Sequence, residues 1–307
     1  MRTVPLRSLL DVDDLAPDEL VSVLDRAMAF RDALPSRELC AGVPVLNLFF
    51  EASTRTATSF TLAEQRVGAD VITFAPGASS LGKGETIADT ALTLRGIGVR
   101  VIVVRHPESG FARRLSDSFD GHVINAGDGT HAHPTQALLD LMTLYQEFRR
   151  FDGLRVAIVG DILHSRVARS NIVGMRALGI DVTLVGPPTL LPRDFIVPGV
   201  RIDRDLDAVL SRVDAVMMLR IQRERIDTGL LPSLDDYTQH FQLNRARLRS
   251  LRGDAIILHP GPYNRGVELT DDVLDDPRSR YVAQVHNGVF VRMAVLDLLV
   301  NGAPVPA

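Results

Sequence analysis

Short apolar runs that recur along the whole chain constrain its fold more than any other feature. They are rich in β-branched residues, and they alternate with stretches whose apolar residues recur at helical spacing. The runs are residues 43–50, 70–74, 99–104, 122–127, 154–161, 181–187, 214–220 and 255–261. Strand and helix in this alternation predict parallel sheets covered by helices. We therefore expect an α/β protein.

The length of 307 residues suits two domains, each with its own core. A long helical pattern at residues 133–150 precedes a new series of strands, which suggests a boundary near residue 135. We expect a first domain at 1–134 and a second at 135–285, each a parallel sheet flanked by helices, with the active site in the cleft between them. The helical segment 286–307 is expected to pack back on the first domain.

The composition of the chain limits the kinds of partner that it is expected to bind. The 34 Lys and Arg against 38 Asp and Glu give a net charge of −4, so no overall basic field would attract nucleic acid or an anionic membrane. No run of about 18 apolar residues and no signal-like N-terminus is present, so we expect a cytoplasmic protein. Cys40 is the single cysteine, and we expect it to be a small buried apolar residue. No cluster has metal-ligand spacing, so neither a metal nor a cofactor is expected.

A turn rich in hydroxyl groups follows the first apolar run. Residues 53–56 read Ser-Thr-Arg-Thr, directly after a predicted strand that ends near Phe50. Ligands of open parallel sheets bind beyond the carboxyl ends of the strands. Backbone amides, hydroxyls and the guanidinium of Arg55 at a helix start suit a dianionic phosphate. The alternative is a helix whose hydroxyls only cap its own N-terminus.

The segment from residue 154 resembles the start of a dinucleotide-binding unit, but its glycine pattern fails. Gly160 is followed by Asp-Ile-Leu-His, so the G-x-G-x-x-G pattern that lets a pyrophosphate approach the backbone is absent. Arg166 lies at this predicted sheet edge. It indicates a carboxylate partner or, equally, a solvated surface arginine.

Seven segments in order point to one family. They are STRTATSF (53–60), SSLGKGETIADT (79–90), VRHPESG (104–110), NAGDGTHAHPTQALLDL (125–141), VGDILHSRVARSN (159–171), LRIQRERID (219–227) and LHPGPYNRGVEL (258–269). Together they closely resemble the catalytic chain of aspartate carbamoyltransferases, from about residue 9 to residue 299. The resemblance implies transfer of the carbamoyl group of carbamoyl phosphate to L-aspartate, the committed step of pyrimidine synthesis.

The resemblance also implies roles for residues that bind carbamoyl phosphate. The phosphate would be held by Ser53, Thr54, Arg55 and Thr56. The carbamoyl oxygen would be surrounded by Thr56, Arg105 and His133. The carbamoyl amino group would be oriented by Gln136 and by the backbone carbonyls around Pro260 and Gly261. For His133 the alternative is a helix-start residue that only bonds backbone.

Aspartate, by the same resemblance, would be held by Arg166, Arg220 and Gln222. Two carboxylates call for two cationic forks, and arginine pairs with a carboxylate in bidentate fashion where lysine does not. Glu51 would bridge Arg166 and Arg225 when the domains close, and it could also be a capping carboxylate.

The resemblance further implies that the glycine-flanked Lys83 acts in a neighbouring subunit's site, in contact with carbamoyl phosphate and aspartate. A lysine on such a loop is otherwise a solvated charge. Its companion serine is Ser79 or Ser80, and Ser80 is preferred. A shared site implies a homotrimer. The sequence leaves open whether the trimer associates with regulatory chains or dihydroorotase, and which allosteric effectors it has.

Two residues differ from the family pattern or lie at a variable position in it, and two alternative functions remain to be weighed. Ala57 stands where family members often carry a second arginine, and His131 is expected to face solvent. Ornithine carbamoyltransferases carry an HCLP motif with a cysteine, whereas this chain reads LHPGP, so the acceptor should be a dicarboxylate. A non-catalytic homologue is the other alternative. Against it stand six retained residues: Thr56, Lys83, Arg105, His133, Arg166 and Arg220.

Overall fold

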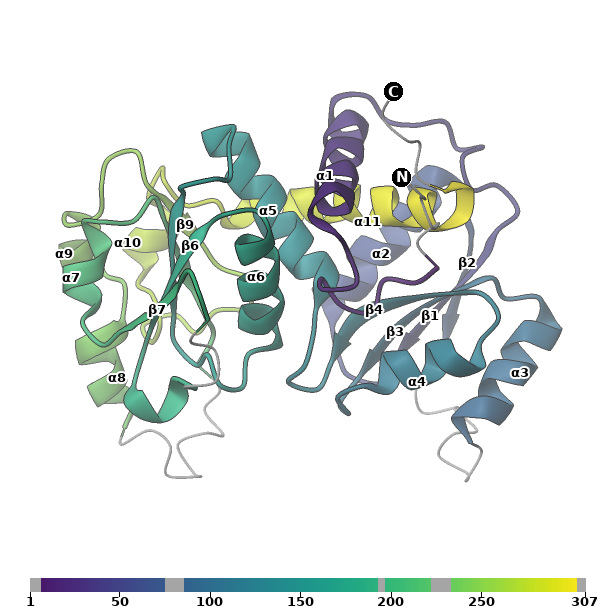
Figure 1. The fold of residues 1–307 in the computed structure, drawn as a ribbon, viewed down its shortest axis with the longest axis horizontal. Helices are drawn as coiled ribbons and strands as arrows, with labels where there is room; N and C mark the ends of the chain where they lie inside the picture. Colours follow the sequence, from purple (N-terminus) through teal and green to yellow (C-terminus); the bar gives the residue numbers. More distant parts are fainter. Residues whose placement is uncertain (1–6, 75–85, 193–196, 222–232, 303–307) are drawn as a thin grey trace. The chain divides into compact units, whose positions relative to one another are not determined.

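Two separate parallel sheets organise the chain (Figure 1). The computed structural model describes residues 7–74, 86–192, 197–221 and 233–302. The sheets belong to two units: unit 1 comprises residues 1–142 and 286–307, and unit 2 comprises residues 143–285. The predicted α/β class with two helix-flanked parallel sheets is therefore confirmed.

The units divide within a helix. Unit 1 ends at Met142, inside α5 (Pro134–Phe148), whereas the sequence suggested a boundary after residue 134. In the first half of α5, which belongs to unit 1, Ala137, Leu138 and Leu141 are completely buried. Residues 286–307 also belong to unit 1.

The sheet of unit 1 has the strand order β2-β1-β3-β4, and all its pairs are parallel. The strands are β1 (Pro44–Phe49), β2 (Asp70–Phe74), β3 (Val101–His106) and β4 (His122–Asp128). Its helices are α1 (Pro17–Asp32), α2 (Thr54–Val67), α3 (Ile87–Ile97), α4 (Phe111–Ser118), the first half of α5, and most of α11 (Tyr281–Asn301).

Successive side chains of β1 point to opposite faces of this sheet. Leu46 and Leu48 join the apolar cluster formed with α3 and α4. Asn47 points the other way and hydrogen-bonds Glu64 of α2. The sheet of unit 1 is therefore covered on both faces, with α3 and α4 on one side (Figure 1).

The end of α2 is set by Gly68. Its φ of 83° is left-handed, and a Cβ there would lie 1.6 Å from the carbonyl oxygen of Arg37. Only glycine fits this turn.

The sheet of unit 2 has the strand order β7-β6-β5-β8-β9, again all parallel. The strands are β5 (Arg155–Val159), β6 (Asp181–Val185), β7 (Val200–Asp203), β8 (Ala215–Met218) and β9 (Ile256–Leu258). The helices are α6 (Arg166–Ala177), α7 (Leu206–Leu210), α8 (Leu234–Phe241), α9 (Arg245–Leu248) and α10 (Asp271–Leu274), with a 3-10 turn at Pro188–Leu190.

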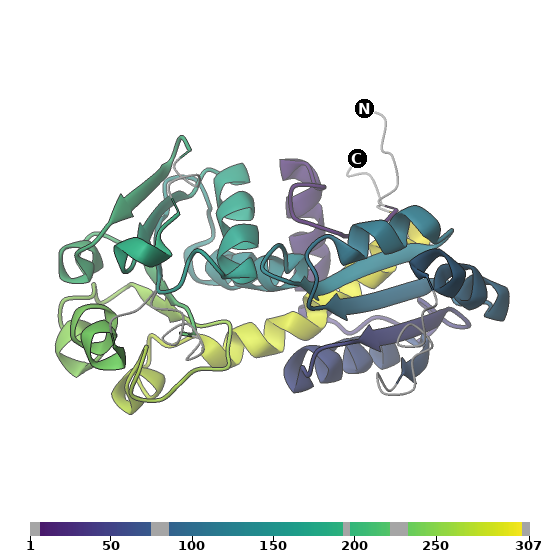
Figure 2. The same cartoon turned by 90° about the horizontal axis from the view of Figure 1, so that it is seen from below.

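An apolar core cluster of unit 2 lies on one face of this sheet. Ala157 and Val159 of β5 and Val216 and Met218 of β8 pack there in a cluster that also includes residues of α7 and α8. Helix α6 covers the opposite face, as the two views of the fold show (Figures 1 and 2).

Two buried features bear on the sequence expectations. Cys40 is 2% exposed, which confirms the expected small buried residue, and burial raises the pKa of its thiol to about 12. Among the described helices, α11 alone has the length and apolar character of a membrane span. Because 78% of its most apolar window is buried, the helix also fits the pattern of a core helix.

Candidate active site

The predicted site residues of unit 1 follow the carboxyl ends of adjacent strands. The hydroxyl-rich turn follows β1, Arg105 is near the end of β3, and His133 comes shortly after β4. β3 pairs with both β1 and β4. Because the carboxyl ends of parallel strands meet at one edge of a sheet, these residues gather at one edge of unit 1.

The first turn of α2 has the features of an anion site. Ser53 is the N-cap, but its side chain makes no capping hydrogen bond, and the first turn carries no acidic residue. Thr54 and Arg55 are exposed, whereas Thr56 is only 9% exposed. The simple N-cap alternative is therefore not realised by Ser53, and the helix dipole favours a negative ligand here.

Arg105 is bound to a carboxylate that the sequence did not assign to it. Its Nε donates to Oε2 of Glu51 at 3.0 Å, and its Nη1 donates to the carbonyl oxygen of Ala126 at 3.4 Å. The Arg105 side chain is 14% exposed and that of Glu51 29%. Register explains the pair, since Phe49 lies opposite Arg105 and the Phe50 amide donates to the Arg105 carbonyl at 2.8 Å.

His133 and Gln136 lie at the start of α5. His133 is buried, and its carbonyl oxygen accepts from the Gln136 amide at 3.0 Å. The side-chain Nε2 of Gln136 donates to Oδ1 of Asp140 at 3.0 Å. The sequence interpretation did not include Asp140, although a charged residue inside the apolar run ALLDLM, four residues after Gln136, was the available signal.

Asp128 holds the loop that leads to His133. Its carboxylate accepts from the amides of Gly110 at 2.6 Å and Ala132 at 3.1 Å, and from Nδ2 of Asn125 at 2.8 Å. His131 is 46% exposed, in line with the expected solvent-facing position, but its Nδ1 also lies 3.2 Å from Asp128. This network fixes the approach of the chain to His133.

Unit 2 brings its two predicted arginines to adjacent strands. β5 pairs with β8 with Val159 opposite Met218, Arg166 begins α6 shortly after β5, and Arg220 follows β8. Arg166 is half-buried and Arg220 is exposed. In the part of the chain that the structure describes, the Arg220 guanidinium has no ion-pair partner. Both residues thus follow the carboxyl ends of neighbouring strands.

The loop after β9, the next strand in this sheet, is held by His259. His259 accepts with Nδ1 from the Gly261 amide at 2.8 Å, and its own amide donates to Oε1 of Gln284 at 2.9 Å. Gly261 has a φ of 64°, the left-handed region that suits glycine. His259 thus positions the backbone at Pro260 and Gly261, a role that the sequence interpretation missed.

Comparison with known proteins identifies the family. The model of the aspartate/ornithine carbamoyltransferase carbamoyl-P binding domain matches residues 7–146, and the model of the Asp/Orn binding domain of the same family matches residues 152–299. The chain belongs to the aspartate/ornithine carbamoyltransferase family.

Individual carbamoyltransferases match nearly the whole chain. An aspartate carbamoyltransferase catalytic subunit of Salinispora tropica is 51% identical over 304 residues, which are 97% of this chain and 99% of the relative. One of Granulibacter bethesdensis is 52% identical over 296 residues, 95% of this chain and 94% of the relative. Aspartate transcarbamoylase of Trypanosoma cruzi in complex with carbamoyl phosphate and aspartate is 32% identical, with a TM-score of 0.87 and coverage of 95% and 96%.

Several of the predicted site residues lie outside the residues that the structure describes. They are Ser80, with its alternative Ser79, and Lys83, Gln222 and Arg225. In the described part of the chain, no group of three or more His, Cys, Asp and Glu residues could hold a metal ion.

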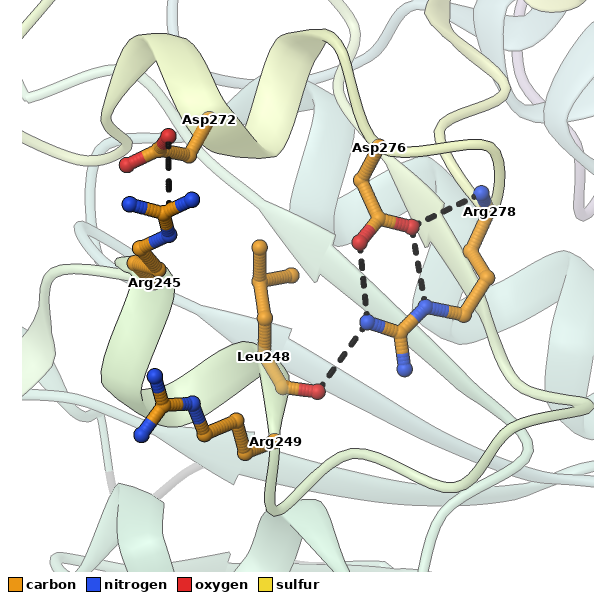
Figure 3. Close-up of a pocket in the computed structure, with 6 residues that line it drawn as sticks. All are labelled: Arg245, Leu248, Arg249, Asp272, Asp276 and Arg278. Atoms are coloured by element: carbon orange, nitrogen blue, oxygen red, sulfur yellow. Dashed lines mark hydrogen bonds and ion pairs between the residues drawn. The ribbon is translucent and has the colours of Figure 1, made fainter.

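A pocket of about 470 Å³ elsewhere in unit 2 contains none of the carbamoyltransferase positions (Figure 3). Its lining residues are Arg245, Leu248, Arg249, Asp272, Asp276 and Arg278. Asp276 binds the Arg278 guanidinium through both carboxylate oxygens at 2.9 Å, and Asp272 lies 4.0 Å from Arg245. Because these aspartates already offset two of the three arginines, the pocket is a poor site for a dicarboxylate.

Proposed function

We propose that this chain transfers the carbamoyl group of carbamoyl phosphate to the amino group of L-aspartate. The products are N-carbamoyl-L-aspartate and phosphate, and the reaction belongs to de novo pyrimidine biosynthesis. The observation that carries the proposal is the match of both domains to aspartate carbamoyltransferase catalytic subunits at about half identity.

Unit 1 binds carbamoyl phosphate in this proposal. The phosphate lies at the first turn of α2, where Ser53, Thr54, Arg55 and Thr56 supply amides, hydroxyls and a guanidinium. The uncapped start of α2, with no acidic residue in its first turn, supports this assignment.

The reaction forms a bond between the aspartate nitrogen and the carbamoyl carbon. Negative charge builds on the carbamoyl oxygen during the attack, and Thr56, Arg105 and His133 donate hydrogen bonds to that oxygen. The bond from carbon to the bridging oxygen then breaks, and the attacking nitrogen gives up one proton, which leaves with the departing phosphate. Preorganised donors of this kind contribute about 3 to 4 kcal/mol each to transition-state stabilisation.

Unit 2 binds aspartate in this proposal. Arg166 and Arg220, which follow neighbouring strands, each pair with one carboxylate, and Gln222 and Lys83 complete the aspartate contacts. The carbonyls around Pro260 and Gly261, held by His259, accept from the carbamoyl amino group. Glu51, bound to Arg105 in this structure, exchanges this partner for Arg166 and Arg225 during catalysis.

The active assembly is a cytoplasmic homotrimer in this proposal. Ser80 and Lys83 of one subunit complete the site of the next, so a single chain has no complete site. This arrangement makes subunit association a requirement for turnover.

A colorimetric assay for carbamoyl aspartate tests the activity. With carbamoyl phosphate and L-aspartate the protein should form carbamoyl aspartate, and with ornithine in place of aspartate it should form no carbamoyl product. A thermal melt with N-(phosphonacetyl)-L-aspartic acid gives a second readout, because a ligand that binds only the folded state raises Tm. No product and no Tm shift at saturating ligand would exclude the proposed activity, and product with ornithine alone would favour the ornithine rival.

A further inference from the structure

Asp140 is a buried carboxylate in the first half of α5. Its exposed fraction is 0%, and its sequence neighbours Leu139 and Leu141 are also buried. Burial of a charged group in an apolar setting is costly unless hydrogen bonds compensate. The buried carboxylate of Asp140 therefore needs a hydrogen-bond partner.

Gln136 is a partner that lies one turn earlier on the same face of α5. Its Nε2 donates to Oδ1 of Asp140 at 3.0 Å, the (i, i+4) spacing of a helix. An ionised carboxylate only accepts hydrogen bonds, so against an ionised Asp140 the Gln136 amide presents its nitrogen, as it does in this structure. The contact thus decides which way the amide of Gln136 is turned.

The other end of the Gln136 amide remains able to accept. In the described part of the chain, Oε1 of Gln136 receives no hydrogen bond, and the residue is 8% exposed. A rotation of the amide by half a turn would exchange Oε1 for the NH2 group. That NH2 group would then oppose the NH2 group of a carbamoyl substrate, donor against donor.

We propose that Asp140 is a positioning residue that turns the Gln136 amide so that Oε1 accepts a hydrogen bond from the amino group of carbamoyl phosphate. The inference rests on the proposed function, and it makes Asp140 a determinant of specificity. The site prefers a carbamoyl group to an acyl group that carries methyl in place of NH2, because only the carbamoyl group can donate to Oε1.

Two stable phosphonates that differ in this one group test the inference by titration calorimetry. Phosphonoacetamide carries the NH2 group, and acetonylphosphonate carries methyl in its place. The wild-type protein should bind phosphonoacetamide more tightly. Asp140→Asn, which is nearly isosteric, and Asp140→Ala should lower the affinity for phosphonoacetamide about tenfold and leave the affinity for acetonylphosphonate within about twofold.

A double-mutant cycle separates positioning from general damage. Gln136→Ala should abolish the preference for phosphonoacetamide, and Asp140→Asn in the Gln136→Ala background should change neither affinity further. The inference fails if Gln136→Ala keeps the preference, if Asp140→Asn keeps it, or if the two losses multiply. The preference measured for Gln136→Ala still tests the inference if an Asp140 variant does not fold.

Leu141→Ala is the matched control, since it removes a fully buried side chain of the same helix without touching the Gln136–Asp140 contact. It should lower Tm and keep the preference for phosphonoacetamide, and loss of the preference in this control would count against a specific role. The colorimetric assay on the wild type separates the two ideas. Product formation with an unchanged Asp140→Asn preference overturns this inference alone, whereas no product and no binding of either phosphonate overturns the proposed function.

Discussion

Arg105 shows how one side chain can link fold and chemistry. It is near the end of β3, it is mostly buried, and it holds the Glu51 carboxylate at 3.0 Å. Glu51 itself is 29% exposed, so water can solvate its carboxylate if Arg105 is removed. The chemistry of this arginine can therefore be tested without loss of the fold.

Arg105→Ala should lower kcat by roughly a hundred- to a thousandfold, because Arg105 is proposed to donate to the developing oxyanion. Steady-state assays of carbamoyl aspartate measure the effect, with a thermal melt to show that the protein is folded. Arg114→Ala is the control, because Arg114 is an exposed arginine of unit 1 that pairs with Glu108. A variant at Arg105 that kept more than about a third of the wild-type rate would rule out the oxyanion role.

Arg220→Ala should raise the KM for aspartate far more than the KM for carbamoyl phosphate, because its guanidinium is proposed to hold a substrate carboxylate. Initial rates with each substrate varied in turn give the two constants. Arg212→Ala, at an exposed arginine of the same unit that pairs with Asp203, should change neither. Equal increases in both constants would remove the assignment of Arg220 to aspartate.

At the scale of single residues, the sequence could propose site residues but not the contacts that hold them. Ser53 to Thr56, Arg105 and His133 lie in motifs that a resemblance can match. The Glu51–Arg105 pair depends on the register of β1 and β3, which puts Phe49 opposite Arg105. No motif states that register, so pairs of this kind need the structure.

At the scale of secondary-structure elements, buried polar side chains connect helix α2 to a neighbouring strand and helix. Glu64 of α2 is fully buried and accepts from Nδ2 of Asn47 at 2.6 Å. Arg292 of α11 donates to Oγ of Ser59 at 2.8 Å, and its guanidinium lies 4.8 Å from the centre of the Phe60 ring. These contacts join β1, α2 and α11 behind the proposed phosphate site.

Burial raises the pKa of Glu64 from 4.5 to about 7, opposed by the Asn47 hydrogen bond and by the charge of Arg292. The folded state therefore binds this proton more tightly than the unfolded chain does, and the free energy of unfolding falls as pH rises from about 4.5 to about 7. The change corresponds to at most about 3 kcal/mol. Burial also lowers the pKa of Arg292 to about 10, so its titration lies above this window.

Glu64→Gln should remove this pH dependence while it keeps a side chain of similar size beside Asn47. Between pH 4.5 and 8 the wild-type Tm should fall relative to the Tm of the variant, and the difference should level off above about pH 7. Differential scanning calorimetry at matched ionic strength measures it. Burial likewise raises the pKa of Asp11, to about 6, but Asp11 contributes equally to both proteins. A Tm difference that did not change with pH would contradict the raised pKa.

The helices and strands were more predictable than the contacts that hold the site residues, because each helix or strand depends on a local sequence pattern. The runs at 43–50 and 99–104 became β1 and β3, since β-branched apolar residues suit buried parallel strands. The pattern could not show that the unit boundary falls after Met142 inside α5. A continuous helix has no local signal for the point at which its contacts change.

At the scale of the whole molecule, the two sheets explain why the proposed ligands divide between the units. The residues proposed for the phosphate and the carbamoyl oxygen, Ser53 to Thr56, Arg105 and His133, follow strands of unit 1. Arg166 and Arg220, proposed for aspartate, follow strands of unit 2. The sequence predicted this division through its strand series and its resemblance. Lys83 is different, because its proposed partner is another copy of the chain.

Arg55→Ala and Lys83→Ala test whether sites are shared between subunits. Each variant should be inactive alone, because every site of the proposed homotrimer would lack one of the two cations proposed to be essential. The two variants are mixed in equal amounts while denatured, and then refolded together. A site is complete wherever the Arg55 of a Lys83→Ala chain meets the Lys83 of an Arg55→Ala chain.

Random assortment in a closed ring of three makes roughly a quarter of all sites complete, one in each mixed trimer. The mixture should therefore recover about a quarter of the activity of refolded wild type, measured as carbamoyl aspartate formed per chain. Each variant refolded alone is the control for reversion and for residual activity, and native mass measurement shows that trimers have formed. If the mixture stays as inactive as its parents although mixed trimers are present, Lys83 acts within its own chain or has no catalytic role. Catalysis would then not require the proposed trimer, because each site would be formed without Lys83 of a neighbouring subunit.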